Sequence, residues 1–320
     1  MNRPAPSSSS SRSADPRGAG GSRATSGVAA ALRALDVRPS RKLGQNFLTD
    51  PRVAERIAGV ALAGAPAAVG GAAGVGVAAG VVETPGALLE IGPGLGALTE
   101  RLAATGRPLV AVELDLRLAE RVETLLRPHS HARVVRGDIL DQRLAALLPG
   151  SGPVTVVANL PYAITSPAIS WILEQGPRVE RAVLMTQREV AQRLAAKPGS
   201  KDYGSFSVFV ALHAELQVEF RVSPAAFHPR PDVDSVVFTL RPRPYPRTTA
   251  EERARVERLV RAATSGRRKT LANSLGHGLE MGAARARALL DRAEVDPGRR
   301  AETLSVEEWL AVARVGGGNA

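Results

Sequence analysis

The stretch Glu90-Ile91-Gly92-Pro93-Gly94-Leu95-Gly96 follows a short apolar run and precedes a segment with helical periodicity. Glycine lets the backbone approach a ligand closely, and nucleotides bind beyond the carboxyl ends of parallel strands. The spacing G-x-G-x-G differs from the dinucleotide spacing G-x-G-x-x-G, which disfavours NAD, and the chain has no G-x-x-x-x-G-K-[ST] phosphate loop. The stretch therefore predicts a strand, a tight turn and a helix beside a cofactor site, with a purely structural turn as the alternative.

Apolar runs and amphipathic segments alternate along the chain after this turn. The expected strands are 87–91, 109–113, 133–136, 154–158 and 182–185, and the expected helices are 97–104, 116–126, 167–174 and 189–195. This alternation predicts an α/β fold with a mostly parallel, Rossmann-like sheet covered by helices on both faces. Two more apolar runs, 216–222 and 235–240, follow one another without an intervening helix, so we expect an antiparallel edge pair.

The composition divides the chain into three expected parts. Residues 1–27 contain five consecutive serines and no apolar core of a signal peptide, so we expect a disordered basic tail. Residues 28–244 hold the strand pattern and form the expected cofactor-binding, catalytic domain, interrupted by a flexible Ala/Gly insertion at 63–82. Residues 245–320 are helical and Arg-rich, which predicts a small α-helical C-terminal domain.

The positive charge of the chain lies at its two flanks. The formal net charge is +11; residues 83–220 carry −1, while 1–82 and 221–320 each carry +6. A neutral core between basic flanks favours nucleic acid or another polyanion as the partner.

Several site classes are excluded or disfavoured by composition. The chain has no cysteine, which removes disulfides, thiolate nucleophiles and Cys-based metal sites. Only His129 and His131 lie close together among five histidines, so no metal site is expected. The uncharged stretch 57–82 is long enough for a membrane span, but its later part is nearly all Ala and Gly with one proline. We therefore expect no membrane association and a cytoplasmic protein.

Two carboxylates follow the second and third expected strands. Glu113 ends the second strand, where a carboxylate can accept both hydroxyls of a ribose. Asp138 follows the third strand and is either an acceptor for an adenine amino group or a helix cap. With the glycine turn, this pattern fits an adenosine-containing cofactor, either NAD or S-adenosylmethionine.

The motif Asn159-Leu160-Pro161-Tyr162 follows the fourth expected strand at the same edge of the sheet. The exocyclic nitrogen of adenine is a poor nucleophile because its lone pair is delocalised into the ring. The Asn159 side-chain oxygen and the backbone carbonyl of Leu160 or Pro161 can accept its two N–H bonds while the lone pair develops toward a methyl group. Tyr162 can stack on the base, which contributes about 1–3 kcal/mol. Positioning and electrostatic preorganisation then carry catalysis, and no strong general base is needed.

These motifs resemble those of the ribosomal RNA adenine dimethyltransferase family, whose members are class I methyltransferases that use S-adenosylmethionine. The resemblance extends from Arg41 to about Gly276 and includes the stretches 41–48, 90–96, 159–162, 227–235 and 267–275, with Glu113 and Asp138. It implies these cofactor contacts: Asn46, Leu48, Gly92, Gly94, Glu113, Asp138 and Asn159. It also implies that Gln45 and Asn46 close over the cofactor and that Phe227 sandwiches a flipped-out adenine against Tyr162. Ala163 stands where family members often have Asn, which puts one secondary contact in doubt.

The resemblance implies an rRNA substrate with N6 of adenine as the methyl acceptor. Arg41, Lys42, Arg267, Arg268 and Lys269 are the expected phosphate contacts, with a solvated helix face as the alternative for the last three. The Leu after Asn159 and the 267–275 stretch favour dimethylation of two adjacent adenines near the 3′ end of 16S rRNA, by a monomer acting during small-subunit biogenesis. The alternatives are dimethylation of 23S rRNA with macrolide resistance, a largely non-catalytic assembly factor, and a DNA adenine methyltransferase.

Overall fold

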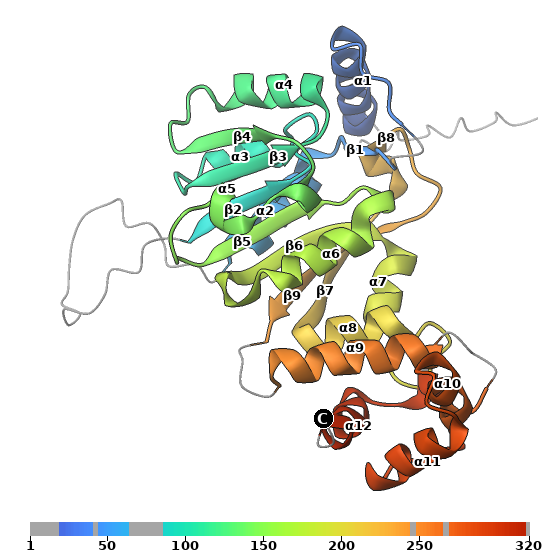
Figure 1. Ribbon diagram of the computed structural model, residues 1–320. Helices are drawn as coiled ribbons and strands as arrows, with labels where there is room; N and C mark the ends of the chain where they lie inside the picture. The colour runs from blue at the N-terminus through green and yellow to red at the C-terminus, as the bar shows by residue number, and fades with distance from the viewer. Residues whose placement is uncertain (1–18, 41–43, 64–85, 244–247, 265–268, 318–320) are drawn as a thin grey trace, which may run out of the picture.

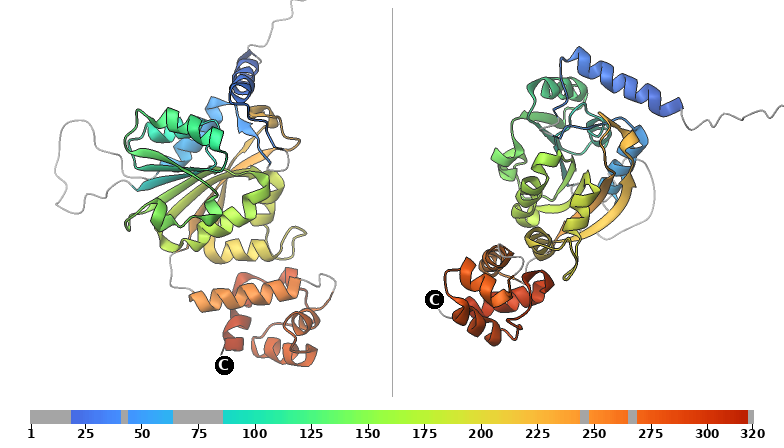
Figure 2. Two further views of the ribbon diagram at one scale, coloured as in Figure 1. Left: turned by 45° about the horizontal axis from the view of Figure 1, so that its top comes forward. Right: turned by 90° about the vertical axis from the view of Figure 1, so that its right-hand side faces the viewer.

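The computed structural model describes residues 19–40, 44–63, 86–243, 248–264 and 269–317; the side chains of 19–26 and of Tyr162 lie outside this description. A seven-stranded sheet forms the centre of the molecule, with helices on both faces and a group of C-terminal helices below it (Figures 1 and 2). No helix within the described ranges is long and apolar enough to cross a membrane.

The sheet has the strand order β4-β3-β2-β5-β6-β9-β7. Its strands are β2 (Ala87–Ile91), β3 (Leu109–Glu113), β4 (Ala132–Arg136), β5 (Val154–Asn159), β6 (Val179–Gln187), β7 (Ala214–Val222) and β9 (Ser235–Pro242). The first five are parallel to one another, while β9 is antiparallel to both β6 and β7. The predicted α/β class, the parallel sheet and the antiparallel edge pair are confirmed.

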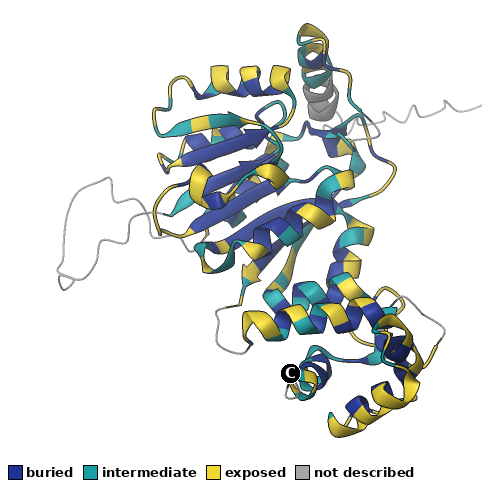
Figure 3. Cartoon of the chain, viewed as in Figure 1, coloured by how far each residue is buried: buried dark blue, intermediate teal, exposed yellow. Residues whose placement is uncertain are grey.

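Two layers of helices bury the sheet because its strands are apolar on both faces. One layer consists of α2 (Pro51–Leu62), α3 (Thr99–Ala103) and α4 (Leu116–Leu126). The other consists of α5 (Leu144–Leu147), α6 (Thr165–Glu174) and α7 (Arg188–Leu194). The strand centres are buried and the outer helix faces are exposed (Figure 3).

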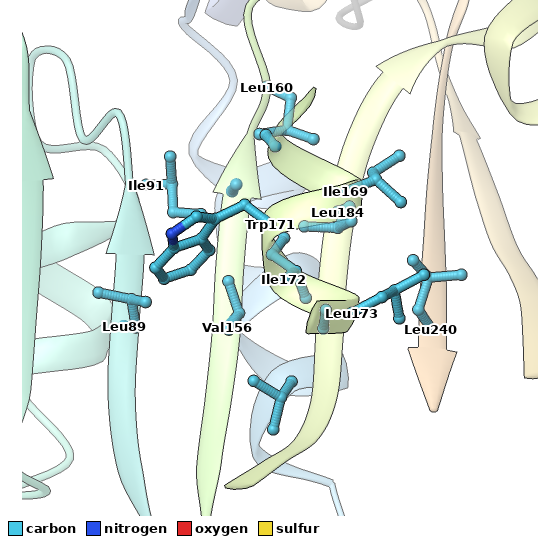
Figure 4. Packing of buried hydrophobic residues seen from close by; sticks show 14 of the residues in the cluster. Leu89, Ile91, Val156, Leu160, Ile169, Trp171, Ile172, Leu173, Leu184 and Leu240 are labelled. Atoms are coloured by element: carbon cyan, nitrogen blue, oxygen red, sulfur yellow. The ribbon is translucent and has the colours of Figure 1, made fainter. Parts of the chain in front are cut away.

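Alternation along each strand separates the two cores. Leu89 and Val156 pack against Trp171 of α6 on one face (Figure 4), whereas Leu88 and Val157 pack against α2 and α3 on the other. The Trp171 indole N–H donates to the Gln142 carbonyl at 2.9 Å, so the ring is held with its polar atom satisfied. The buried faces therefore hold the strand ends, and the loops that follow them, in a defined register.

The C-terminal helices are α9 (Ala250–Thr264), α10 (Leu271–Gly278), α11 (Ala283–Arg292) and α12 (Val306–Gly317). They share a hydrophobic cluster around the fully buried Trp309. Tyr203 and two residues of α8 (Ser205–His213) belong to the same cluster, so packing crosses the expected division at residue 245. That division stays a prediction.

The N-terminal region differs from the expected tail. Residues 19–27 belong to α1 (Ala19–Ala34), so the expected disorder is wrong for this part; residues 1–18 lie outside the described residues. Alanine favours helix, and Leu32 and Val37 anchor the end of α1 and the turn after it against Phe47 and Leu118. Of the expected insertion 63–82, only Ala63 is described; it caps the C-terminus of α2.

Candidate active site

The carboxyl ends of β2, β3 and β5 meet at one edge of the sheet. Ile91 pairs with Val112 on one side and Ala158 on the other, so the glycine turn, Glu113 and Asn159 emerge side by side. A pocket of about 90 Å³ lies there. It is lined by residues 44–48, Glu90, 92–95, Ala97, Leu98, Glu113, Leu118 and 159–161. This volume is smaller than the roughly 300–1,000 Å³ of typical ligand pockets, so a nucleoside cofactor must extend past it or widen it.

The glycine turn uses conformations that favour glycine. Gly92 and Gly94 have φ of +65° and +58°, in the left-handed region. A Cβ on Gly94 would also lie 3.2 Å from the Phe47 ring. The turn therefore packs closely against Phe47 of β1 (Phe47–Leu48), and β1 in turn pairs with β8 (Phe227–His228).

Glu113 ties the turn to β3. Its Oε2 accepts from the Gly94 N–H and its Oε1 from the Asp115 N–H, both at 3.0 Å. Burial raises the pKa of this carboxyl, although the backbone N–H groups of Asp115, Gly94 and Leu114 oppose that shift. Each oxygen has a second lone pair, so the fixed carboxylate can still accept ribose hydroxyls.

Asn159 is oriented by the segment before α2. Its side-chain Nδ2 donates to the Asn46 carbonyl at 3.1 Å, and the Asn46 side chain donates to the Gly44 carbonyl at 3.2 Å. Because a carbonyl accepts only from the nitrogen of the amide, this bond assigns the two ends of the Asn159 side chain. Its Oδ1 then has no donor among the described residues and is available as an acceptor.

The two backbone carbonyls after Asn159 are not equivalent. The Pro161 carbonyl already accepts from the Ile164 N–H and the Thr165 hydroxyl, each at 3.1 Å. No described residue donates to the Leu160 carbonyl, while the Leu160 N–H donates to the Met185 carbonyl at 3.0 Å. Since a carbonyl oxygen has two lone pairs, Leu160 presents the available acceptor next to Asn159.

The two aromatic residues are in different positions. The backbone of Tyr162 begins a short 3₁₀ turn, Tyr162–Ile164, directly after the pocket; its side chain lies outside the described residues. Phe227 is only 3% exposed and packs opposite Leu48 in the β1–β8 pair. It is close to the pocket but does not line it.

Asp138 lies beside the pocket and not in its wall. Its Oδ1 accepts from the Leu140 N–H at 2.9 Å and caps the short turn Ile139–Asp141. The cap alternative therefore holds for Oδ1, and Oδ2 stays available. The exposed leucines Leu114 and Leu140, which the sequence reasoning missed, follow Glu113 and Asp138. Leu114 comes directly after the last residue of β3 and Leu140 lies two residues after Asp138, so an apolar residue close to each acidic position was the signal for them.

Glu90 is a further residue to which the sequence motifs assigned no role. It lines the pocket, is 1% exposed, and neither carboxylate oxygen has a hydrogen-bond partner among the described residues. Burial raises its pKa to about 8; the neighbouring Thr99 hydroxyl opposes this shift and the charge of Glu113 adds to it. Its signal was an acidic residue inside an otherwise apolar strand.

Most of the expected phosphate contacts cannot be located. Arg41, Lys42, Arg267 and Arg268 lie outside the described residues, and Lys269 is exposed just before α10. In the described part of the chain, no group of three or more His, Asp or Glu side chains could hold a metal ion. The His129 and His131 rings lie 5.6 Å apart, and His131 is hydrogen-bonded to the Ala103 carbonyl.

Comparison with known proteins now gives the family. The family described as "Ribosomal RNA adenine dimethylase" matches residues 38–315. "Ribosomal RNA small subunit methyltransferase A" of Geobacter metallireducens is 40% identical over 286 residues, 88% of this chain and 97% of the relative. The protein of that name from Anaeromyxobacter sp. is 43% identical over 294 residues, 89% of this chain and 96% of the relative.

Two solved structures are similar to this chain in fold, and the first of them supports the family match. The 23S rRNA methyltransferase ErmE is 30% identical with a TM-score of 0.59, over 84% of this chain and 99% of that one. A dimethyladenosine transferase from Plasmodium falciparum shares the fold, with a TM-score of 0.64 and 22% identity over 83% of this chain and 95% of that one. The chain thus has the class I methyltransferase fold and belongs to the ribosomal RNA adenine dimethylase family.

Proposed function

We propose that this protein transfers methyl groups from S-adenosylmethionine to N6 of two adjacent adenines near the 3′ end of 16S rRNA. The observation that carries the proposal is the orientation of the Asn159 amide, which leaves Oδ1 as an acceptor beside the Leu160 carbonyl, to which no described residue donates. Two acceptors at the end of β5, facing the glycine turn, match the two N–H bonds of an adenine amino group.

These acceptors act on the nucleophile. Accepting both N–H bonds directs the nitrogen lone pair out of the ring plane, toward the pocket. The cofactor supplies an electrophilic methyl group on a sulfonium sulfur. The nitrogen forms the new N–C bond as the S–C bond breaks, the electron pair stays on sulfur, and one N6 proton passes to water. Positioning and preorganised acceptors are sufficient for this reaction class.

The cofactor contacts follow from the same edge of the sheet. We assign the ribose hydroxyls to Glu113 and the adenine amino group to Oδ2 of Asp138. Leu114 and Leu140 offer apolar faces to the adenine ring. Asn46, Leu48, Gly92 and Gly94 would surround the methionine part, because they line the pocket with Glu90.

The substrate adenine would stack between Tyr162 and Phe227. Because Phe227 is buried in the β1–β8 pair, stacking requires that this pair shifts or that the ring turns toward the pocket. Arg41, Lys42 and residues 267–269 are the proposed phosphate contacts of the rRNA, consistent with the +6 charge of each flank.

The experiment that tests this function is transfer of labelled methyl from S-adenosylmethionine to unmodified small and large ribosomal subunits in competition. Label in the 16S rRNA of the small subunit supports the proposal. Label in 23S rRNA would replace it with the resistance activity. Binding to small subunits without any label would instead indicate a non-catalytic assembly factor.

A further inference from the structure

A second cavity lies at the edge of the sheet opposite the active site. It measures about 400 Å³ and lies where β2, β3 and β4 begin and just before β5. Strands that run parallel end at one edge and begin at the other, so this cavity is separated from the methyl-transfer pocket by the length of the strands (Figure 1).

Among the described residues that line this cavity, the ionisable side chains are all basic: His131, Arg133 and Arg178. Arg133 Nη2 donates to the Leu147 carbonyl at 2.5 Å, and Arg178 Nη2 donates to the Leu148 carbonyl at 2.9 Å. Because these carbonyls belong to consecutive residues at the end of α5, they hold the two guanidinium groups as neighbours.

The charge of this pair is not compensated. Neither arginine has a carboxylate within 4.0 Å among the described residues. The Nε and Nη1 atoms of Arg178 are buried and lack a hydrogen-bond partner there. Buried donors on a charged group are costly to leave unpaired, and within the described ranges this wall of the cavity offers them no acceptor.

A third arginine, Arg107, also has buried side-chain donors without a hydrogen-bond partner among the described residues. Arg107 is 5% exposed, and its Nε donates to the carbonyl of Gly86, a residue of the cavity wall. Both of its Nη atoms are buried without a partner in the described part of the chain. Burial lowers the pKa of Arg107 and the nearby Glu180 carboxylate raises it, so Arg107 adds buried donors beside the cavity wall, while the charge that no described carboxylate compensates is that of Arg133 and Arg178.

We propose that this cavity binds a phosphate group. Guanidinium groups pair well with phosphate oxygens, which are charged and can accept several N–H bonds at once. The remaining lining is apolar, with Pro108, Pro149 and Pro153, and suits the carbon atoms of an attached sugar. The phosphate comes either from free phosphate or phosphate monoesters, or from the rRNA backbone; the second source rests on the proposed function.

The first arm of the test measures thermal unfolding of the cofactor-free protein in 0–50 mM inorganic phosphate at constant ionic strength. We expect wild type and the control Arg143→Gln, an exposed arginine before α5, to gain about 2–4 °C at the highest concentration. Arg178→Gln should lose this gain. Arg178→Lys, which keeps the charge but not the Nε and Nη1 donors, should retain less than half of it.

The second arm measures how binding to unmodified small subunits depends on salt. Loss of one backbone phosphate contact in Arg178→Gln should lower the slope of log K against log salt by about 1, relative to Arg143→Gln. A thermal gain lost in Arg178→Gln supports free phosphate, and a change of slope alone supports the rRNA backbone.

Failure of both arms would overturn the phosphate site. S-adenosylmethionine affinity is measured in every variant and should stay within two-fold of wild type, since the cavity lies at the far edge of the sheet. If neither arm detects phosphate binding but methyl transfer persists, the proposed function stands and only the phosphate site is refuted. If methyl transfer is absent but inorganic phosphate still stabilises the protein, the phosphate site stands and only the proposed function is refuted.

Discussion

Replacing Glu90 with Gln should change how the stability of the cofactor-free protein depends on pH. The carboxyl is 1% exposed, and burial raises its pKa from 4.5 to about 8. A raised pKa means that the folded protein holds the proton more tightly than the unfolded chain. The stabilising contribution is therefore fully present below pH 4.5 and is lost as the pH rises to 8.

The size of this contribution to the unfolding free energy follows from about 1.4 kcal/mol for each unit by which the pKa is raised. Between pH 5 and pH 9, wild type should lose about 4 kcal/mol of unfolding free energy relative to Glu90→Gln. Most other titrations are shared by the two proteins and cancel in the difference. Urea unfolding at each pH measures it, with Glu100→Gln, an exposed carboxyl on α3, as the control for loss of a charge.

Two results would refute the reasoning about Glu90. A wild-type minus variant difference that stays constant within 1 kcal/mol from pH 5 to pH 9 would mean that Glu90 does not titrate abnormally. A difference of the opposite sign would mean that an unseen donor stabilises its ionised form.

Four further changes have defined outcomes. Asn159→Ala should lower methyl transfer by at least about 10²–10³-fold while cofactor and rRNA affinities stay within a few-fold; retained activity would remove Asn159 from the reaction. Glu113→Gln should weaken S-adenosylmethionine binding by about 10–100-fold in calorimetry, because a charged acceptor for the ribose is lost, and unchanged affinity would contradict that role. Trp309→Ala should cost about 3–5 kcal/mol in urea unfolding, since the side chain is fully buried among α9–α12, and a cost under 1 kcal/mol would show that the cluster does not depend on it. Neutralising residues 267–269 together should flatten the salt dependence of rRNA binding by up to about three units of slope, whereas an unchanged slope favours an ordinary solvated face.

The sheet was predictable because its strands are short and apolar on both faces. The expected ranges 87–91 and 109–113 coincide with β2 and β3, and the expected helix 116–126 coincides with α4. The start of α2 is likewise marked locally, because Asp50 caps the helix by accepting from the Arg52 N–H at 2.9 Å and Pro51 stands at its first position. These features depend on neighbours in sequence, so local pattern carries them.

Features that depend on long-range contacts were not predictable. The pairing of Phe47–Leu48 with Phe227–His228 joins segments about 180 residues apart, and it buries a ring expected to face the substrate. The bond from Asn159 to the Asn46 carbonyl likewise depends on tertiary packing. Local sequence showed that Asn159 could accept from adenine, but only the fold determines which of its side-chain atoms is available.

The helix α1 was missed for a related reason. Its residues are small and polar enough to resemble a disordered tail. Its apolar anchor Leu32, and Val37 in the turn after the helix, pack against residues of β1 and α4. A helix with so few anchors gains its stability from the surface it packs against, which composition does not reveal.

The most direct test of the central claim is the position and number of methyl groups added to 16S rRNA. Unmodified small subunits are incubated with the protein and S-adenosylmethionine, and the rRNA is digested and analysed by mass spectrometry. The account predicts two adjacent N6,N6-dimethyladenines near the 3′ end, four methyl groups in total, and none with Asn159→Ala. Methyl groups on another base, or only on 23S rRNA, would contradict it.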